Sequence, residues 1–249
     1  MEQLIIGVDC ATKPASVGLA LACSENNTWI LREAFTCRGL NPATIVSDWM
    51  HNSSGLILLA LDAPLGWPAS LGSHLQGHHA GALLPEEANM LFRRATDRFV
   101  YEQLGKTALD VGADKIARTA HWALCFLHEV RSNSGLPIPL AWATGGAHDT
   151  QAIEVYPAAT LLAHGVLISS GYKKPEQIQT RQSIVAKLEK NLEIGACADI
   201  LENNHDALDA AVCVLAGIDF LSGAASEPTH LELAKREGWI WLRQPSSFS

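Results

Sequence analysis

Four aspartates stand where carboxylates could assemble a catalytic site: Asp9, Asp62, Asp206 and Asp209. Asp9 and Asp62 each end a short apolar run, and the other two lie three residues apart at the start of an apolar stretch. Asp is rarely buried unless a metal ion, a cationic partner or backbone donors compensate its charge. Converging carboxylates suit Mg²⁺ or Mn²⁺, and two such ions roughly 3.5 to 4 Å apart can hydrolyse a phosphodiester. The four aspartates therefore predict a catalytic site that depends on a divalent cation.

Two further groups could contact a substrate phosphate. Arg94 precedes Arg98 by four residues, so both would share one helical face, and a guanidinium fork suits phosphate. The alternative for Arg94 is a surface turn with a salt bridge to Asp97. Lys173, Lys174 and Arg181 belong to the most basic segment, 173–190, and could also reach a phosphate. The alternative for this group is a solvated face of a helix.

Glu154 is a further candidate for substrate binding. It lies in a short run with strand character that Pro157 ends. Alternation along a strand points its side chain opposite to that of Val155. A single Glu in a strand is also common at an exposed edge, so both interpretations stay open at this stage.

Short apolar runs and one helix must position the aspartates. Apolar runs between turn residues predict buried strands, and the almost wholly apolar run that ends at Asp62 is typical of a parallel strand covered on both faces. Ligands gather at the carboxyl ends of such strands, so Asp9 and Asp62 are expected to face each other. The predicted elements are strands over 4–10, 17–22, 28–35, 56–62 and 153–157, helices over 41–50, 175–190, 206–221 and 232–236, and an edge strand or docking tail over 238–242.

The order strand, strand, strand, helix, strand opens a ribonuclease H-like sheet, and it also opens the related actin-like ATPase and sugar-kinase fold. Residues 64–150 are rich in Pro, Gly and His and contain helical stretches over 86–104 and 113–130. We expect an α/β fold: one ribonuclease H-like domain over 1–249, with a mixed sheet, flanking helices and 64–150 as an inserted helical cap.

Composition limits the possible partners and compartments. The net charge is −8, from 18 basic and 26 acidic residues, so there is no global electrostatic footprint for nucleic acid, although a local basic groove remains open. The six cysteines are scattered, which favours buried thiols in a reducing compartment over disulfides or a zinc site. The start of the chain resembles neither a secretory signal nor a membrane span. We expect a cytoplasmic protein with no membrane partner, which could form homo-oligomers.

Several short motifs follow one another along the chain: Gly7-Val8-Asp9, Leu61-Asp62-Ala63-Pro64-Leu65-Gly66, Arg94-Ala95-Thr96-Asp97, Glu154-Val155-Tyr156-Pro157, the segment from Lys173-Lys174 to Arg181, and Asp206-Ala207-Leu208-Asp209-Ala210. In this order and spacing they resemble domain of unknown function 429, a family of predicted nucleases with a ribonuclease H-like fold. The last motif is also similar to the final helix of Holliday-junction resolvases in that superfamily.

The resemblance implies which residues have which role. Asp9, Asp62 and Asp209 would bind Mg²⁺ or Mn²⁺, with Asp206 beside them. The positions that match Arg94, Asp97 and Glu154 would line the pocket.

Three functions are compatible with these residues. The first is a metal-dependent nuclease acting on nucleic acid or a nucleotide, with Arg94 steadying the phosphate. The second is a sugar-kinase-type phosphotransferase, in which the loop after Asp9, with Thr12 and Lys13, would hold the phosphates of ATP; this fold needs a second sheet. The third is a catalytically silent binding protein that uses the helical cap as its partner surface.

Overall fold

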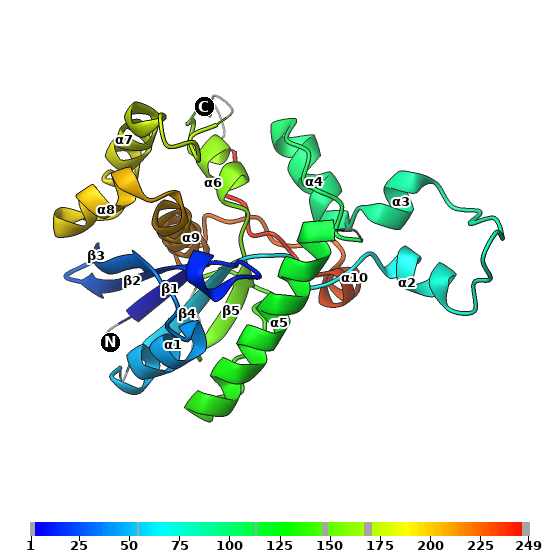
Figure 1. The fold of residues 1–249 in the computed structure, drawn as a ribbon, viewed down its shortest axis with the longest axis horizontal. Coiled ribbons are helices and arrows are strands. Elements are labelled where there is room, and N and C mark those ends of the chain that lie inside the picture. Colours follow the sequence, from blue (N-terminus) through cyan, green and yellow to red (C-terminus); the bar gives the residue numbers. More distant parts are fainter. Residues whose placement is uncertain (1–2, 54, 113, 146–148, 167–170, 246–249) are drawn as a thin grey trace.

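The computed structural model describes residues 3–53, 55–112, 114–145, 149–166 and 171–245. Its five strands form one mixed sheet in the order β3-β2-β1-β4-β5 (Figure 1). The first three strands are antiparallel, whereas β4 and β5 run parallel to β1. This α/β topology agrees with the predicted ribonuclease H-like fold. The strands are β1 (Gln3–Asp9), β2 (Gly18–Glu25), β3 (Thr28–Thr36), β4 (Leu56–Asp62) and β5 (Gln151–Glu154).

Both faces of the sheet are buried, which explains the apolar runs. Along β1, Ile5 points into one core cluster, and Leu4, Ile6 and Val8 point into another on the opposite face. This follows from the two-residue period of a strand. The central strands therefore have no solvated face on which a polar side chain would be favoured.

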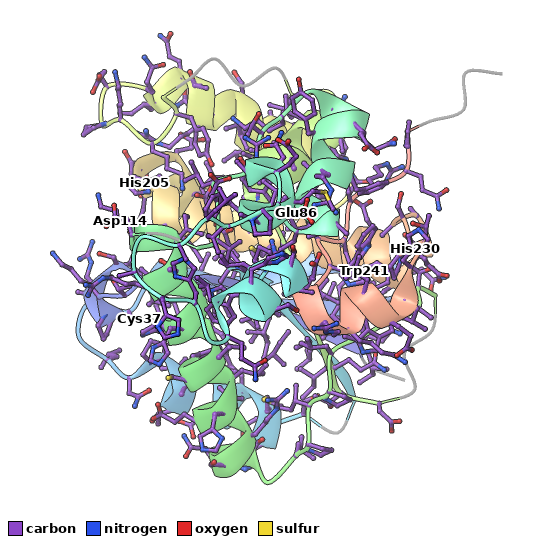
Figure 2. The ribbon with its side chains drawn as sticks, turned by 90° about the vertical axis from the view of Figure 1, so that its right-hand side faces the viewer. Cys37, Glu86, Asp114, His205, His230 and Trp241 are labelled. Atoms are coloured by element: carbon purple, nitrogen blue, oxygen red, sulfur yellow. The ribbon has the colours of Figure 1, made fainter. Side chains whose placement is uncertain are left out.

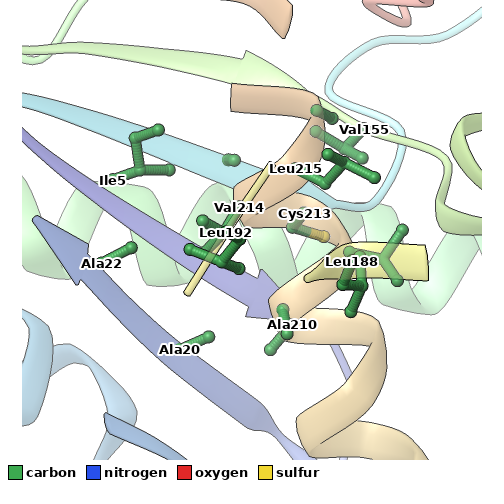
Figure 3. Packing of buried hydrophobic residues seen from close by; sticks show 14 of the residues in the cluster. Ile5, Ala20, Ala22, Val155, Leu188, Leu192, Ala210, Cys213, Val214 and Leu215 are labelled. Atoms are coloured by element: carbon green, nitrogen blue, oxygen red, sulfur yellow. The ribbon is translucent and has the colours of Figure 1, made fainter. Parts of the chain in front are cut away.

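Different helices cover the two faces. Helices α1 (Pro42–His51) and α5 (Asp114–Ser134) pack on one face, and α9 (His205–Leu221) packs on the other (Figure 1). Figure 3 shows Val214 of α9 over the sheet, near Ile5, Ala20 and Ala22 from β1 and β2. Helix α9 is buried almost along its whole length, as its Ala, Val and Leu content predicts.

Glycine allows α9 to lie unusually close to the sheet. A Cβ atom at Gly7 would collide with the carbonyl oxygen of Ala210, and one at Gly18 would collide with that of Asp206. The backbone of α9 thus rests directly on β1 and β2 at the level of its first turns. This contact brings the start of α9 next to the end of β1.

The segment 64–150 differs in part from the predicted cap. Helices α2 (Ala69–Leu75) and α3 (Ala88–Phe92) form an arm that projects from the body, and α4 (Ala95–Leu104) lies at its base (Figure 1). Figure 2 looks along the arm, with Glu86 labelled on it. Helix α5, however, belongs to the core, because Phe126 and Leu127 pack with the sheet and α1. The stretch predicted as one helix over 86–104 is broken between α3 and α4.

Short turns, further helices and the last segment of the chain complete the fold. The last segment of the chain docks next to β5 through a single bridge between Glu154 and Ile240, so 238–242 is a docking tail rather than a full edge strand. The elements are the 3₁₀ turns η1 (Pro14–Ser16) and η2 (Gly195–Cys197) and the helices α6 (Pro157–Ala163), α7 (Ile178–Leu188), α8 (Ala198–Asn203) and α10 (Leu231–Glu237).

Several local predictions are confirmed. Asn41 caps α1 by accepting hydrogen bonds from the backbone N–H groups of Ala43 (2.8 Å) and Thr44 (3.2 Å), and Pro42 occupies the first helical position. All six cysteines are free thiols, and five of them are buried; Cys125 is exposed. Among the described helices, none combines the length and the apolar character that crossing a membrane requires.

Candidate metal centre

Three aspartates meet at the carboxyl ends of β1 and β4. Asp9 and Asp62 are paired directly in the parallel register of the two strands, as predicted. Asp209, on the second turn of α9, completes the group: one carboxylate oxygen from each residue lies within 4.8 Å of the others. Asp9 and Asp209 are buried, and Asp62 is partly buried. Three of the four predicted catalytic aspartates are thus brought together.

The electrostatics of this cluster are those of crowded carboxylates. Burial raises the pKa of Asp9 well above its ordinary value, and the charges of Asp209 and Asp62 raise it further. The pKa of Asp62 rises from 3.8 to about 7, because of burial first and the charge of Asp209 second. Lys173 lowers both pKa values but does not cancel the increase. The three carboxylates therefore carry more negative charge than the one ammonium of Lys173 can balance.

The fourth predicted aspartate, Asp206, lies one turn before Asp209 at the start of α9. The side chain of Asn204 caps this helix by accepting from the N–H groups of Asp206 (2.9 Å) and Ala207 (3.1 Å). Asp206 is partly exposed, and one of its oxygens is 2.8 Å from Nδ1 of His205, which Figure 2 labels. It is not one of the three residues whose oxygens converge, although its charge raises the pKa of Asp9.

Two further residues hold Asp209: Lys173, which the sequence offered only as a possible phosphate contact, and Tyr172, which the sequence did not single out. The hydroxyl of Tyr172 donates a 2.6 Å hydrogen bond to Oδ1 of Asp209, and Nζ of Lys173 lies 2.5 Å from Oδ2. The side chain of Lys173 is 52% exposed, so it also faces solvent. The sequence predicted that this basic segment contacts a phosphate, but only the fold shows that Lys173 is the lysine whose ammonium contacts Asp209.

Arg181 is buried beneath the segment that carries Lys173. Its guanidinium donates to the backbone carbonyls of Tyr172 (2.7 Å), Lys174 (2.7 Å), Pro175 (3.2 Å) and Glu202 (2.5 Å). The prediction that Arg181 contacts substrate does not fit this placement, because its donors are occupied by the backbone. Arg181 instead holds the 172–175 segment against the end of α8, which positions Lys173 at the carboxylates.

Arg94 forms the centre of a second buried cluster. Its Nε and Nη2 donate to the two oxygens of Asp97 (3.0 and 2.8 Å), and Nη1 and Nη2 donate to those of Glu154 (2.9 and 2.7 Å). The remaining N–H donates to the carbonyl of Glu237 (3.1 Å). All five guanidinium donors are used, so Arg94 has none free for a substrate phosphate, contrary to the sequence-based expectation.

This cluster joins three distant parts of the chain. Glu154 ends β5 and also accepts a 2.9 Å hydrogen bond from the N–H of Leu65. Glu237, at the end of α10, accepts from the N–H groups of Ala69 (2.7 Å) and Ala95 (2.6 Å), where α2 and α4 begin. Glu154 is therefore neither an exposed edge residue nor a metal ligand, because it anchors the base of the arm to the sheet.

A cavity of about 110 Å³ lies between the two clusters. Asp62 borders it on the side of the three aspartates, and Arg94, Asp97 and Glu154 border it on the other. The arrangement therefore offers three carboxylates that could hold a cation, an exposed ammonium beside them, and a small cavity that Asp62 borders.

Comparison with known protein families agrees with these motifs. A family model described as "Protein of unknown function (DUF429)" matches residues 7–232. The chain belongs to this family. The match includes all three converging aspartates and both residues that hold Asp209, but the family description assigns no activity. A search among curated proteins found no match.

The raised pKa values predict how stability depends on pH. A carboxyl whose pKa is higher in the folded state binds its proton more tightly there. The stability that Asp62 gains from its proton is therefore fully present below pH 3.8 and is lost as the pH rises through about 7. In EDTA, the free energy of unfolding should fall across this range, by about 1.4 kcal/mol for each unit of upward shift. Urea denaturation at several pH values measures this.

Two variants identify the source of the pH effect. Asp62→Asn should make the profile less steep between pH 4 and 7, because it removes one raised carboxyl and lessens the repulsion that raises the pKa of Asp9. Asp48→Asn, an exposed position on α1, should leave the slope unchanged. A wild-type profile that rises over this interval would contradict the crowded-carboxylate description.

The second cluster predicts a large difference between adjacent arginines. Arg94→Met leaves the carboxylates of Asp97 and Glu154 buried without their partner, so it should cost about 3 to 5 kcal/mol of unfolding free energy. Arg93→Met removes only a partly exposed pair with Asp110 and should cost about 1 kcal/mol or less. Urea denaturation distinguishes them. If Arg94→Met is as stable as wild type but binds substrate more weakly, Arg94 contacts the substrate and its structural role is wrong.

Proposed function

We propose that this protein is a metal-dependent phosphodiesterase that acts on nucleic acid or a nucleotide. The observation that carries the proposal is the convergence of Asp9, Asp62 and Asp209 within 4.8 Å at the ends of two parallel strands and one helix. Buried carboxylates in such proximity repel one another unless a cation joins them. Hydrolysis of phosphodiesters is one of the reactions that carboxylate-bound Mg²⁺ and Mn²⁺ support.

The donor set fits a divalent cation. Three carboxylates face one ammonium, that of Lys173, so two negative charges remain uncompensated when all are ionised. The donors are oxygens, which favours Mg²⁺ or Mn²⁺ over softer metals. Ligands on opposite sides of a magnesium ion lie about 4.2 Å apart, close to the present spread of the carboxylate oxygens. Asp9, Asp62 and Asp209 would therefore be the ligands.

The residues of the chain have separate roles in this proposal. The bound cation would activate a water molecule and stabilise the leaving oxygen. Tyr172 fixes the orientation of the Asp209 carboxylate through its hydroxyl. Lys173, whose pKa is lowered by burial but raised more by Asp209 and Asp9, stays protonated and provides a positive charge beside the ligands. Its exposed ammonium can then contact a substrate phosphate.

The other two functions have weaker support. A sugar-kinase-type phosphotransferase needs a second sheet with its own phosphate loop, and the described residues contain one five-stranded sheet. A silent binding protein would not require uncompensated carboxylates at its centre. These alternatives become outcomes of the experiments below.

The test of the proposal combines metal binding with cleavage. Mg²⁺ or Mn²⁺ at 100 times the dissociation constant should stabilise the wild-type protein by about 2.7 kcal/mol. Asp9→Asn should lose this gain, together with at least about 100-fold of the cleavage rate, equivalent to about 2.7 kcal/mol of transition-state stabilisation. The substrates are single-stranded DNA, duplex DNA, RNA and ATP.

Asp48→Asn is the matched control, because it removes an exposed carboxylate from the surface of α1. It should behave as wild type in both measurements. Absence of metal stabilisation and of cleavage in the wild-type protein would favour the binding role, and ATP turnover that depends on an acceptor would favour the phosphotransferase.

The two adjacent lysines provide a second test. Lys173→Ala removes the ammonium that competes with a cation for Asp209, so metal should stabilise this variant more than wild type, while cleavage falls about 10- to 100-fold (about 1.4 to 2.7 kcal/mol). Lys174→Ala should change neither quantity. Equal effects of the two substitutions would mean that Lys173 has no specific role.

A further inference from the structure

The cavity beside Asp62 is not explained by metal binding or by folding. It lies between the carboxyl ends of β4 and β5 on one side and, on the other, the connection from α4 to α5 and the first turn of α5. Asp62 borders both this cavity and the three-aspartate cluster. A group in the cavity would therefore lie next to any group that binds at the three aspartates.

Its outer wall is apolar and open to solvent. Pro64, Ala108, Leu109 and Ile116 contribute to this wall. Leu109 is 68% exposed although it borders the cavity, so a large apolar side chain faces solvent at the rim. An apolar rim of this kind favours a flat, weakly hydrated group over a charged one.

The inner side is acidic and accepts hydrogen bonds. Asp62, Asp97 and Glu154 provide three carboxylates, whereas Arg94 is the cation of this lining and has no free donor. A phosphate would be repelled here. A neutral group with N–H donors on its edge would find acceptor oxygens instead, because a carboxylate can accept more bonds than Arg94 makes.

The size of the cavity restricts the group further. Its volume is about 110 Å³. Complete ligand pockets usually measure about 300 to 1,000 Å³, so a whole nucleotide does not fit. The cavity is smaller than the cavity of about 150 Å³ that encloses a benzene ring, but it is open to solvent, so one planar ring system can insert in part and leave its remainder outside.

We propose that this cavity binds one nucleobase, adjacent to a phosphate at the three-aspartate cluster. A base has apolar faces for Leu109 and Ile116 and N–H donors for the carboxylates. This inference rests on the proposed function and specifies its substrate. A base can enter only when it is unstacked and unpaired, so the substrate is a single strand, a frayed end or a free nucleotide rather than the interior of a duplex.

Nucleoside binding without metal tests the pocket independently of catalysis. Adenosine, cytidine, guanosine and uridine are titrated into the protein in EDTA by calorimetry, with D-ribose as the probe that lacks a base. At least one nucleoside should bind with a dissociation constant of about 1 mM or lower, and ribose should not bind. Ala108→Trp fills the cavity and should weaken nucleoside binding at least about tenfold.

The matched control is Ala80→Trp, which adds the same side chain at an exposed position on the arm. It should bind nucleosides as wild type does. Both variants should keep the stabilisation by Mn²⁺, which shows that they are folded and that the three aspartates are intact. In cleavage assays, Ala108→Trp should raise KM for a single-stranded oligonucleotide, and wild type should cleave it faster than the paired duplex.

The failures of the two proposals are distinguishable. Cleavage that depends on Asp9, with no nucleoside binding or with equal binding by Ala108→Trp, overturns the base pocket and retains the hydrolase. Faster cleavage within a duplex also overturns it. Nucleoside binding that Ala108→Trp abolishes, in a protein that neither binds metal nor cleaves, supports the pocket and overturns the proposed hydrolysis.

Discussion

Repulsion among buried carboxylates is the constraint on which the rest of the site depends. The parallel register of β1 and β4 places Asp9 beside Asp62, and α9 adds Asp209 from the other side. This approach is possible because Gly7 and Gly18 let the helix backbone rest on the strands without a Cβ atom between them. The fold therefore accepts an electrostatic cost at one point, which is typical of functional sites in otherwise locally consistent structures.

The second buried cluster shows the opposite solution to the same problem. Arg94 satisfies two carboxylates with a complete set of hydrogen bonds, and it joins the sheet, the base of the arm and the docking tail. Each of these two carboxylates makes direct hydrogen bonds to the guanidinium, whereas Lys173 contacts only one of the three aspartates. The contrast distinguishes a cluster of ion pairs that holds the fold together from the cluster at which we propose that a cation binds, although both contain buried carboxylates.

Much of this architecture was predictable from local pattern. The strand order, the cap at Asn41 and the meeting of Asp9 with Asp62 follow from apolar periodicity and from the geometry of parallel strands. The roles of Arg94 and Arg181 did not follow, because an arginine in a sequence shows its charge but not which carbonyls or carboxylates will surround it. Lys173 was indistinguishable from its neighbour for the same reason. Helix α5 was predicted to belong to the cap because the sequence does not show that its apolar residues, such as Phe126 and Leu127, pack against the sheet and α1.

The double contact of Glu237 has a consequence for the order in which the chain acquires its structure during synthesis. The N–H groups that begin α2 and α4 are satisfied by a carboxylate that lies more than a hundred residues later, and the carbonyl of the same residue completes the shell around Arg94. Until the ribosome has synthesised α10, the base of the arm therefore lacks this acceptor. The arm is thus synthesised well before α10, which supplies the carboxylate that accepts hydrogen bonds from the first residues of α2 and α4.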